Sequence, residues 1–374
     1  MSIQPSYPIS CGSFPLTMDE FSLHDPCVLA DKRTGMYYLY NANYGQYASS
    51  DFGNGRCVVM YSSPDLVHFS EPVNVFDGNT VADTAWYDNS DSPWAPEVHE
   101  WRGKYWMFVT MHAKRHDGAR PANGPAWFRD RNLLDARRGM VVAVSEMPQG
   151  PFHVMHENMP VTPVDSMALD GTLAVDASGK PWMVFAHEWV QIFDGSMEAI
   201  QLDPEDLSVA VSDPCHLWFA SEGGWHIADG DAPVGGWRGN FATDIAKHVL
   251  SPEISGYVTD GPWVMSTPSG ALVCLWTSYS KGEYILTQAI SETGAMTGPW
   301  KQLAPINYDD AGHAMVFQTF EGDLLLIMHT NMTRKDSQGR PLVSHGIVYE
   351  VSLGEDGFTL GRHRSDIDGL KEAS

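Results

Sequence analysis

The chain has 374 residues and a formal net charge of −24, with 47 acidic side chains against 23 lysines and arginines. Such an acidic balance repels polyanions, so nucleic acids and anionic membranes are excluded as expected partners. An aromatic content of 11%, 34 glycines and 24 prolines favour a turn-rich, all-β chain that is long enough for one ring-like domain.

The first structured unit is predicted to begin at Asp25-Pro26, after an irregular lead-in over residues 1–20. A short strand leads to a turn at Asp31–Gly35, and a tyrosine-rich strand follows, which is typical of a β-hairpin. Proline biases the residue before it toward an extended backbone, so Asp25 is expected to be extended.

Four later stretches repeat this order of a polar opening, a turn with glycine and an apolar strand. They are Trp94–Val109, Ala168–Phe185, Thr259–Trp276 and Gly312–His329. A Ser-Glu pair followed by Gly-Pro-aromatic also recurs, at Ser145–Phe152 and Ser291–Trp300. We therefore predict a five-bladed β-propeller, because a four-stranded blade cannot bury both of its faces unless it packs in a ring.

The expected blades span approximately residues 23–80, 81–160, 165–210, 256–305 and 310–352 of a single domain. The arginine-rich stretch Lys114–Arg138 is expected to be a solvated loop, with a subunit contact or the rim of a site as the alternative. Ser221–Ser255 is predicted to loop over one face of the ring, and such long loops are often functional. The tail Leu353–Ser374 either closes the ring or trails from it.

The innermost strand of each propeller blade lines the central channel, so the polar openings of the units are predicted to converge at one end of it. These openings are His24, Asp25, Glu97, Asp170, Asp260 and His313. A carboxylate held there can take a proton from water. Taken singly the signals are weaker, because Asp25 also suits a turn before a strand and Asp170-Gly171 is a common turn dipeptide.

The order of these motifs resembles glycoside hydrolase family 43 over roughly residues 20–350. The matching motifs are Asp25-Pro26, Trp94-Ala-Pro-Glu97, the Asp170 hairpin, Thr259-Asp-Gly-Pro262 and Gly312-His313. The resemblance implies a five-bladed propeller that hydrolyses arabinofuranosides or xylosides with inversion. Inverting enzymes place their two carboxyl groups about 6.5–9.5 Å apart to admit a water molecule.

By the same resemblance, Asp25 is the general base and Asp170 is a third carboxylate that orients the acid and raises its proton affinity. Asp260 stands where the family usually has glutamate as general acid, and its side chain is one methylene shorter. Proton delivery depends steeply on geometry, so Glu188 is the alternative acid, and Glu222 is a further one. A strand residue with a salt bridge elsewhere is the other interpretation of Glu188.

Several further residues are predicted to bind substrate. Glu97 stands where the family usually has aspartate and is expected to orient the sugar, and Arg340 is expected to hold its hydroxyl groups. Tryptophan in a propeller is more often part of the core, but three tryptophans are candidates to stack on sugar faces. The full set of predicted substrate-binding residues is His24, Trp94, Glu97, His187, Trp189, Trp263 and Arg340.

His313 matches a family position whose imidazole points into the channel and touches a bound calcium ion or a water molecule. One calcium ion in the channel is therefore an expectation of the resemblance, although calcium prefers oxygen ligands to imidazole.

The predicted function is exo-acting hydrolysis of short oligosaccharides, with an α-L-arabinofuranoside as first choice and a β-xyloside or β-galactofuranoside next. Two alternatives stay open. A glycoside phosphorylase would need a cationic phosphate pocket, whereas these openings are acidic. A propeller that binds sugar without cleaving it is the second, because Asp260 replaces a glutamate.

The five cysteines, an odd number without any Cys-x-x-Cys spacing, are expected to be reduced thiols. The first residues have neither a basic start nor an apolar segment of the kind that precedes a cleavage site, and no apolar run approaches the ~20 residues of a membrane helix. A cytoplasmic enzyme is therefore expected. The sequence leaves its oligomeric state open.

Overall fold

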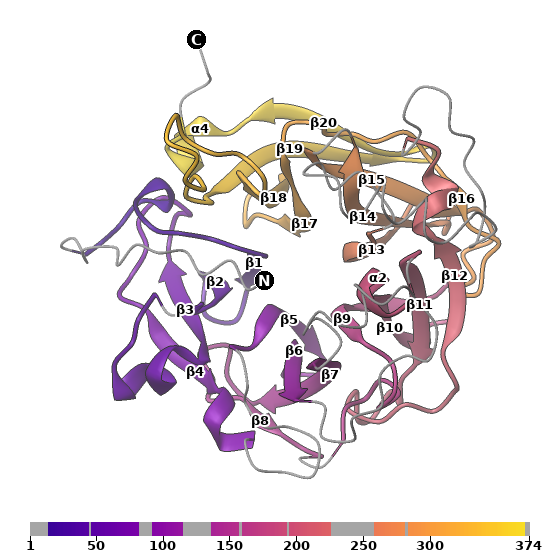
Figure 1. Cartoon of the computed structure of the whole chain (residues 1–374), viewed down its shortest axis with the longest axis horizontal. Helices are drawn as coiled ribbons and strands as arrows, with labels where there is room; N and C mark the ends of the chain where they lie inside the picture. Colours follow the sequence, from indigo (N-terminus) through magenta and orange to yellow (C-terminus); the bar gives the residue numbers. More distant parts are fainter. Residues whose placement is uncertain are drawn as a thin grey trace.

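The computed structural model describes residues 14–44, 46–81, 92–114, 136–156, 159–192, 194–225, 258–280 and 283–370. These residues form five antiparallel sheets of four strands each, which stand around a central axis like the blades of a propeller (Figure 1). The predicted five-bladed β-propeller is confirmed.

The strands of each blade follow one another from the axis outward. The first blade comprises β1 (Cys27–Asp31), β2 (Met36–Ala42), β3 (Cys57–Ser63) and β4 (Val73–Asp77). The second comprises β5 (Trp94–Trp101), β6 (Lys104–Lys114), β7 (Ala136–Ser145) and β8 (His153–Val154). The third comprises β9 (Ala168–Val175), β10 (Pro181–His187), β11 (Ser196–Gln201) and β12 (Cys215–Phe219). The fourth comprises β13 (Asp260–Ser266), β14 (Leu272–Ser280), β15 (Glu283–Ser291) and β16 (Lys301–Gln302). The fifth comprises β17 (Ala311–Gln318), β18 (Leu324–Thr330), β19 (Gly346–Gly354) and β20 (Gly357–His363).

The helices are short and lie between strands or beside the ring closure. They are η1 (Met18–Glu20), η2 (Ser50–Gly55), η3 (Gly78–Val81), α2 (Trp189–Ile192), η5 (Ala220–Gly223) and α4 (Ser365–Asp368). No helix among the described residues is long and apolar enough to cross a membrane.

Apolar side chains fill the space between neighbouring blades. Trp218 of the third blade and Trp276 of the fourth are both fully buried, and their rings lie 5.9 Å apart. Burying one such side chain contributes roughly 1.5–3 kcal/mol, so the ring is held together mainly by these contacts between blades. The polar groups considered below lie instead at the heads of the innermost strands.

The ring closes between the lead-in and the last blade. The Leu23 N–H donates to the Ser344 carbonyl at 3.0 Å, and the Ser344 hydroxyl donates to the Leu23 carbonyl at 2.6 Å. The tail that the sequence left unassigned forms β20 and α4, and α4 packs against both β19 and η1. The fifth sheet therefore extends to His363 and the third to Phe219, beyond the expected limits.

Each innermost strand begins beside one residue with positive φ. These residues are Asp25 (48°), Ala95 (42°), Asp170 (56°), Gly261 (46°) and His313 (48°). In the second to fifth blades the strand register shifts at this residue, as at a β-bulge. Bulges re-aim side chains, and here they recur where the polar groups were expected to converge.

The expectation that Pro26 holds Asp25 extended is wrong, since the φ of Asp25 is 48°. The steric bias of a following proline is local, whereas Asp25 donates its backbone N–H to His329 on the fifth blade at 3.1 Å. This tertiary contact and the ion pair of the Asp25 carboxylate with His313, described below, outweigh the local preference.

Two other expectations concern stretches that lie largely outside the described residues. They are the predicted loop Lys114–Arg138 and the predicted loop Ser221–Ser255. Cys11 also lies outside the described residues, and the four described cysteines, Cys27, Cys57, Cys215 and Cys274, are free thiols.

Candidate active site

His313, at the head of β17, stands at the centre of a cluster of carboxylates from three other blades. Its Nδ1 lies 3.0 Å from Asp25 Oδ1, 3.8 Å from Asp170 Oδ2 and 3.8 Å from Asp260 Oδ1. Burial alone would lower the pKa of His313, but the charges of these carboxylates raise it well above its usual value. His313 is therefore an imidazolium that holds mutually repelling carboxylates together.

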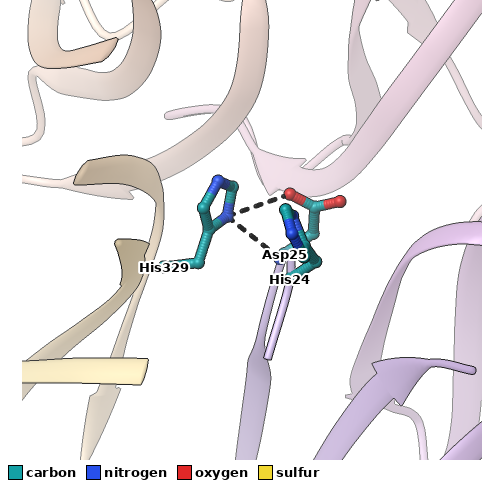
Figure 2. Close-up of side chains that lie close together, drawn as sticks. All are labelled: His24, Asp25 and His329. Carbon is teal, nitrogen blue, oxygen red and sulfur yellow. Dashed lines mark hydrogen bonds and ion pairs between the residues drawn. The ribbon is translucent and has the colours of Figure 1, made fainter. Parts of the chain in front are cut away.

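Asp25 is held by one group that follows β2 in its own blade and by one group from the fifth blade. Tyr44 donates its hydroxyl to Asp25 Oδ2 at 3.1 Å. His329 Nδ1 accepts the Asp25 N–H (Figure 2). Because Nδ1 accepts this hydrogen bond, it carries no proton to donate to Asp25 Oδ1 at 3.2 Å, and the proton of the neutral His329 ring is assigned to Nε2. Burial opposes ionisation of Asp25, but His313 holds the pKa of this carboxyl well below its usual range.

His24 lies beside Asp25. Its ring is 4.8 Å from the His329 ring, and its backbone N–H donates to Asn41 Oδ1 at 3.1 Å. Burial, with a further contribution from His329, lowers the pKa of His24 to about 4. A neutral imidazole therefore flanks the ionised Asp25 at neutral pH.

Asp170 is the most deeply buried of the three carboxylates. Its backbone N–H donates to Thr110 Oγ1 at 3.0 Å, and its Oδ2 accepts the Gly261 N–H at 3.2 Å. Burial first, and then the neighbouring Asp260, raise the pKa of Asp170 well above its usual value. Asp170 therefore keeps a proton close to Asp260, while Asp25 has lost its own.

Asp260 is the carboxylate that a substrate can reach most easily. Its side chain is 20% exposed, compared with 16% for Asp25 and 5% for Asp170. The Tyr284 hydroxyl donates to its Oδ2 at 2.5 Å. The next residue is glycine for a steric reason, because a Cβ at Gly261 would lie 2.6 Å from His313 Cγ.

Glu188 lies near this cluster but has a cationic partner of its own. It follows β10 and forms an ion pair with Arg138, at the start of β7 on the second blade. Burial raises the pKa of Glu188; Arg138 offsets part of this, and the charge of Asp260 adds to it. The ion pair with Arg138 fits the interpretation of Glu188 as a salt-bridged residue. The effect of the Asp260 charge on its pKa fits the interpretation of Glu188 as an alternative acid. Glu222, in η5, instead accepts the Phe219 N–H at 2.9 Å.

Two predicted residues lie deeper in the channel than the cluster. By strand register Glu97 and Trp263 occupy the same place in their blades, the first paired position past the bulge. Both contact His99, Glu97 through a 3.0 Å contact of Oε2 with Nε2 and Trp263 through rings stacked at 5.4 Å. The structure therefore does not bring Glu97 to the head of its blade with Asp25.

The other tryptophans pack against protein groups. The Arg138 guanidinium lies 4.7 Å from the centre of the Trp94 ring, and the His112 ring lies 4.3 Å from it. Trp189 packs against the buried cluster of Tyr279 and Tyr284. A role in stacking on sugar stays a prediction for each.

His187 and Arg340 make contacts outside the carboxylate cluster. His187 Nδ1 lies 2.9 Å from Glu198 Oε1 and its Nε2 lies 2.7 Å from Gln191 Oε1, so it braces the turn that carries Glu188. Arg340 donates to Asp336 Oδ2 at 2.7 Å within the exposed loop between β18 and β19. A role in holding substrate stays a prediction for both.

Several residues that shape the site carry no signal in the sequence repeats. Thr110 and Thr277 are fully buried, and each accepts the backbone N–H of a residue that heads the next blade, Asp170 and His313. Tyr284 lies on β15, the third strand of the fourth blade, and His329 lies on β18, the second strand of the fifth blade. Strand register is the one signal that would have found His329, which pairs with Gly312 across β17 and β18.

A cavity of about 550 Å³ lies where the other ends of the innermost strands meet. Its lining is mainly apolar and includes Val28, Val98, Leu173 and Met315, together with Trp263. It contains none of the cluster carboxylates, so the candidate site is the polar end of the channel.

The groups around His313 do not make a calcium site by themselves. Ligand atoms of Asp170, Asp260 and His313 lie within 4.8 Å of one another, but calcium takes six to eight oxygen ligands. His313 Nδ1 already faces Asp25, and Asp260 Oδ2 already accepts from Tyr284. The imidazolium supplies the positive charge that the expected ion would have supplied, so we derive no step through calcium.

Three carboxylates and one imidazole thus meet at the heads of the innermost strands of a five-bladed propeller. The model of the family described as Glycosyl hydrolases family 43 matches residues 19–359, and the chain belongs to that family. It is accordingly a glycoside hydrolase, and its substrate is a carbohydrate. A comparison with curated protein sequences found no significant match.

Solved structures agree with this assignment. The chain is 29% identical to an endo-arabinase from Bacteroides thetaiotaomicron VPI-5482, with a TM-score of 0.68, covering 93% of this chain and 100% of that one. An endo-1,4-beta-xylanase from the same organism is 17% identical, with a TM-score of 0.63, covering 94% and 97%. An alpha-L-arabinofuranosidase from Lactobacillus brevis is 15% identical, with a TM-score of 0.61, covering 92% and 97%. The last two show the shared fold.

Proposed function

We propose that this glycoside hydrolase cleaves terminal sugars from short oligosaccharides with inversion of the anomeric configuration. The observation that carries the proposal is the arrangement of three carboxylates, Asp25, Asp170 and Asp260, around Nδ1 of His313. The pKa of Asp25 is pushed down and that of Asp170 is pushed up. Such a separation is how one site supplies a base and an acid at the same pH.

Asp25 is proposed as the base. It is ionised and partly exposed, and it lies just before the innermost strand of the first blade. It would take a proton from a water molecule as the water oxygen attacks the anomeric carbon. Tyr44 and His313 hold its two oxygens in place, which fixes the direction of proton transfer.

Asp260 is proposed as the acid, with Asp170 as its proton-holding neighbour. The glycosidic oxygen would take a proton from Asp260 as its bond to the anomeric carbon breaks. The oxygens of Asp25 and Asp260 that face His313 are at most about 7 Å apart, because they lie 3.0 Å and 3.8 Å from the same nitrogen. Inverting enzymes hold their two carboxyl groups about 6.5–9.5 Å apart, and these two oxygens meet that separation only if they lie on nearly opposite sides of His313 Nδ1.

We further propose an α-L-arabinofuranoside as the substrate, with a β-xyloside as the second choice. The similar structures include an endo-arabinase and an alpha-L-arabinofuranosidase. Exo action is supported by the burial of the cluster, in which Asp170, His313 and His329 are each at most 5% exposed. A site whose floor is closed in this way suits the end of a sugar chain better than its middle.

A panel of nitrophenyl glycosides, assayed with and without phosphate, tests this function. Hydrolysis of the α-L-arabinofuranoside without phosphate is expected. A requirement for phosphate would identify a phosphorylase, and binding without turnover on every substrate would identify a sugar-binding propeller. Chromatography of products from reduced arabino-oligosaccharides then separates exo action, which releases single sugars, from endo action.

A further inference from the structure

We propose that Tyr284 is a positioning residue for the acid: its phenol holds Asp260 Oδ2 as a hydrogen-bond acceptor, so that the transferable proton belongs on Oδ1. The inference rests on the proposed function, because it assigns Tyr284 a role through Asp260. Its first support is the contact itself, 2.5 Å from Tyr284 Oη to Asp260 Oδ2. This length lies at the short end of the range for O–H···O hydrogen bonds, so the hydroxyl donates directly to this oxygen.

Tyr284 is fixed along its whole length. It is fully buried near the start of β15, and its backbone N–H donates to Asp310 Oδ1 at 3.1 Å. Asp310 is itself fully buried and also accepts the backbone N–H groups of Thr333 and Arg334, which ties the loop after β18 to the same point. The phenol is therefore preorganised, and little side-chain entropy is lost when it holds its partner.

The fifth blade leaves room for this ring. A Cβ at Gly312 would lie 2.8 Å from Tyr284 Cε1 and 2.4 Å from Thr277 Cγ2. Gly312 directly precedes His313, so the Gly-His pair of the sequence contacts both Tyr284 and the carboxylate cluster. The glycine admits the tyrosine, and the histidine reaches the carboxylates.

The same ring also touches the side of the site that holds the base. It stacks on the His329 ring at 5.4 Å with an interplanar angle of 19°. His329 in turn accepts the backbone N–H of Asp25. The Tyr284 side chain therefore lies between Asp260 and His329, and it keeps the spacing of the proposed acid and the support of Asp25 constant.

The phenol can act only as a donor here. Burial, followed by the charge of Asp260, raises the pKa of Tyr284 well above its usual value, so its proton stays in place. The other groups that face Asp260 are Asp170, His313 and Glu188. Asp170 keeps its proton and can donate it in a hydrogen bond to Asp260, so Asp170, the cationic His313 and the Tyr284 phenol stabilise a new negative charge there.

The consequence appears in the proton-transfer step. As the O–H bond of Asp260 breaks, a bond forms between that proton and the glycosidic oxygen, whose bond to the anomeric carbon breaks. Water supplies the oxygen at that carbon and loses a proton to Asp25. Negative charge therefore develops on Asp260, and the bond from Tyr284 becomes charge-assisted and stronger. Tyr284 makes Asp260 a stronger acid as well as holding it still.

Tyr284→Phe tests this, with Tyr279→Phe as the matched control. The Tyr279 ring lies 5.1 Å from that of Tyr284 in the same buried cluster, and no hydrogen bond joins its hydroxyl to Asp25, Asp170 or Asp260 among the described residues. Tyr284→Phe should lower kcat/KM about tenfold to a hundredfold on arabino-oligosaccharides, which have poor leaving groups. It should change an activated dinitrophenyl glycoside by less than about threefold. The basic limb of the pH profile should move to higher pH, because a carboxylate without its donor holds its proton more tightly.

Three results would overturn the inference. One is an equal loss on both substrates with an unmoved pH profile, which a purely structural role predicts. Another is the same loss when Tyr284→Phe is added to Asp260→Asn, where no acid remains to be positioned. The third is failure of Tyr284→Phe to fold while Tyr279→Phe folds, which would assign the hydroxyl to stability. Failure of the proposed function looks different, because the unmutated enzyme would then retain configuration, or Asp260→Asn would still cleave oligosaccharides.

Discussion

Exchanging each candidate acid for its amide separates Asp260 from Glu188. Asn at position 260 can still accept from Tyr284 and can donate its amide N–H to Asp170, so Asp260→Asn is expected to fold. General acid catalysis contributes about 10²–10⁴-fold, and this is the expected loss on oligosaccharides. Activated aryl glycosides leave with little protonation, so the loss on them should be no more than about tenfold.

Glu188→Gln should behave differently because of Arg138. Both side chains of this ion pair are 13% exposed, so solvent screens the pair little, and glutamine leaves the Arg138 charge with only a neutral acceptor. Hydrogen bonds to charged groups contribute about 1.5–3 kcal/mol, and stability should fall by an amount of that order. Activity should fall alike on both classes of substrate, because a displaced Glu188 loop disturbs the binding of every sugar.

The assay is kcat/KM for both variants on a series of aryl glycosides of graded leaving-group pKa and on a reduced arabinotriose, with melting temperature as the folding control. A steep dependence on the leaving group for Asp260→Asn, and a flat one for Glu188→Gln, is the expected pattern. The reverse pattern would refute the reasoning, since Glu188 would then be the acid and Asp260 a partner of Asp170 that holds no transferable proton.

Four further outcomes are expected. Asp25→Asn should keep its melting temperature within a few degrees and lose turnover by about 10³-fold or more, measured on the best aryl glycoside; activity above a tenth of wild type would remove Asp25 as the base. The pH profile should be broad, because Asp25 stays active until pH falls through its lowered pKa and the pair of Asp170 and Asp260 keeps its proton until pH rises through the raised one; a profile confined between pH 4 and 5 would contradict both directions. Dialysis against EDTA should leave kcat/KM unchanged, and a loss restored by calcium would show that the imidazolium does not replace an ion. Thiol titration of unfolded, non-reduced protein should find all five cysteines free, and a disulfide would contradict the expected cytoplasmic location.

The repeats in the sequence predicted the fold and the convergence of the main polar groups. Asp25, Asp170, Asp260 and His313 were expected together because each opens a unit, and units that pack in a ring bring their openings to one axis. The structure places the three carboxylates around His313 Nδ1. Here the local pattern and the ring symmetry point to the same answer, and this is why the prediction held for these residues.

The rest of the site depends on features that a single sequence does not show. A bulge near the head of each of four innermost strands shifts the register, which puts Glu97 and Trp263 deeper than their distance from the unit opening suggests. Tyr284, His329 and Arg138 reach the carboxylates across strands and blades, so their roles follow from tertiary pairing rather than spacing. The positive φ of Asp25 likewise arises from contacts with the fifth blade, against the local bias of Pro26.

The most direct test of the account is the stereochemistry of the product. The unmutated enzyme is mixed with an aryl α-L-arabinofuranoside, and proton NMR follows the anomeric signal of the sugar first released, before mutarotation. The account predicts the inverted, β-configured sugar, since Asp25 activates water on the face opposite the leaving group. First release of the α-configured sugar would contradict it, because a carboxylate would then be attacking the anomeric carbon as a nucleophile.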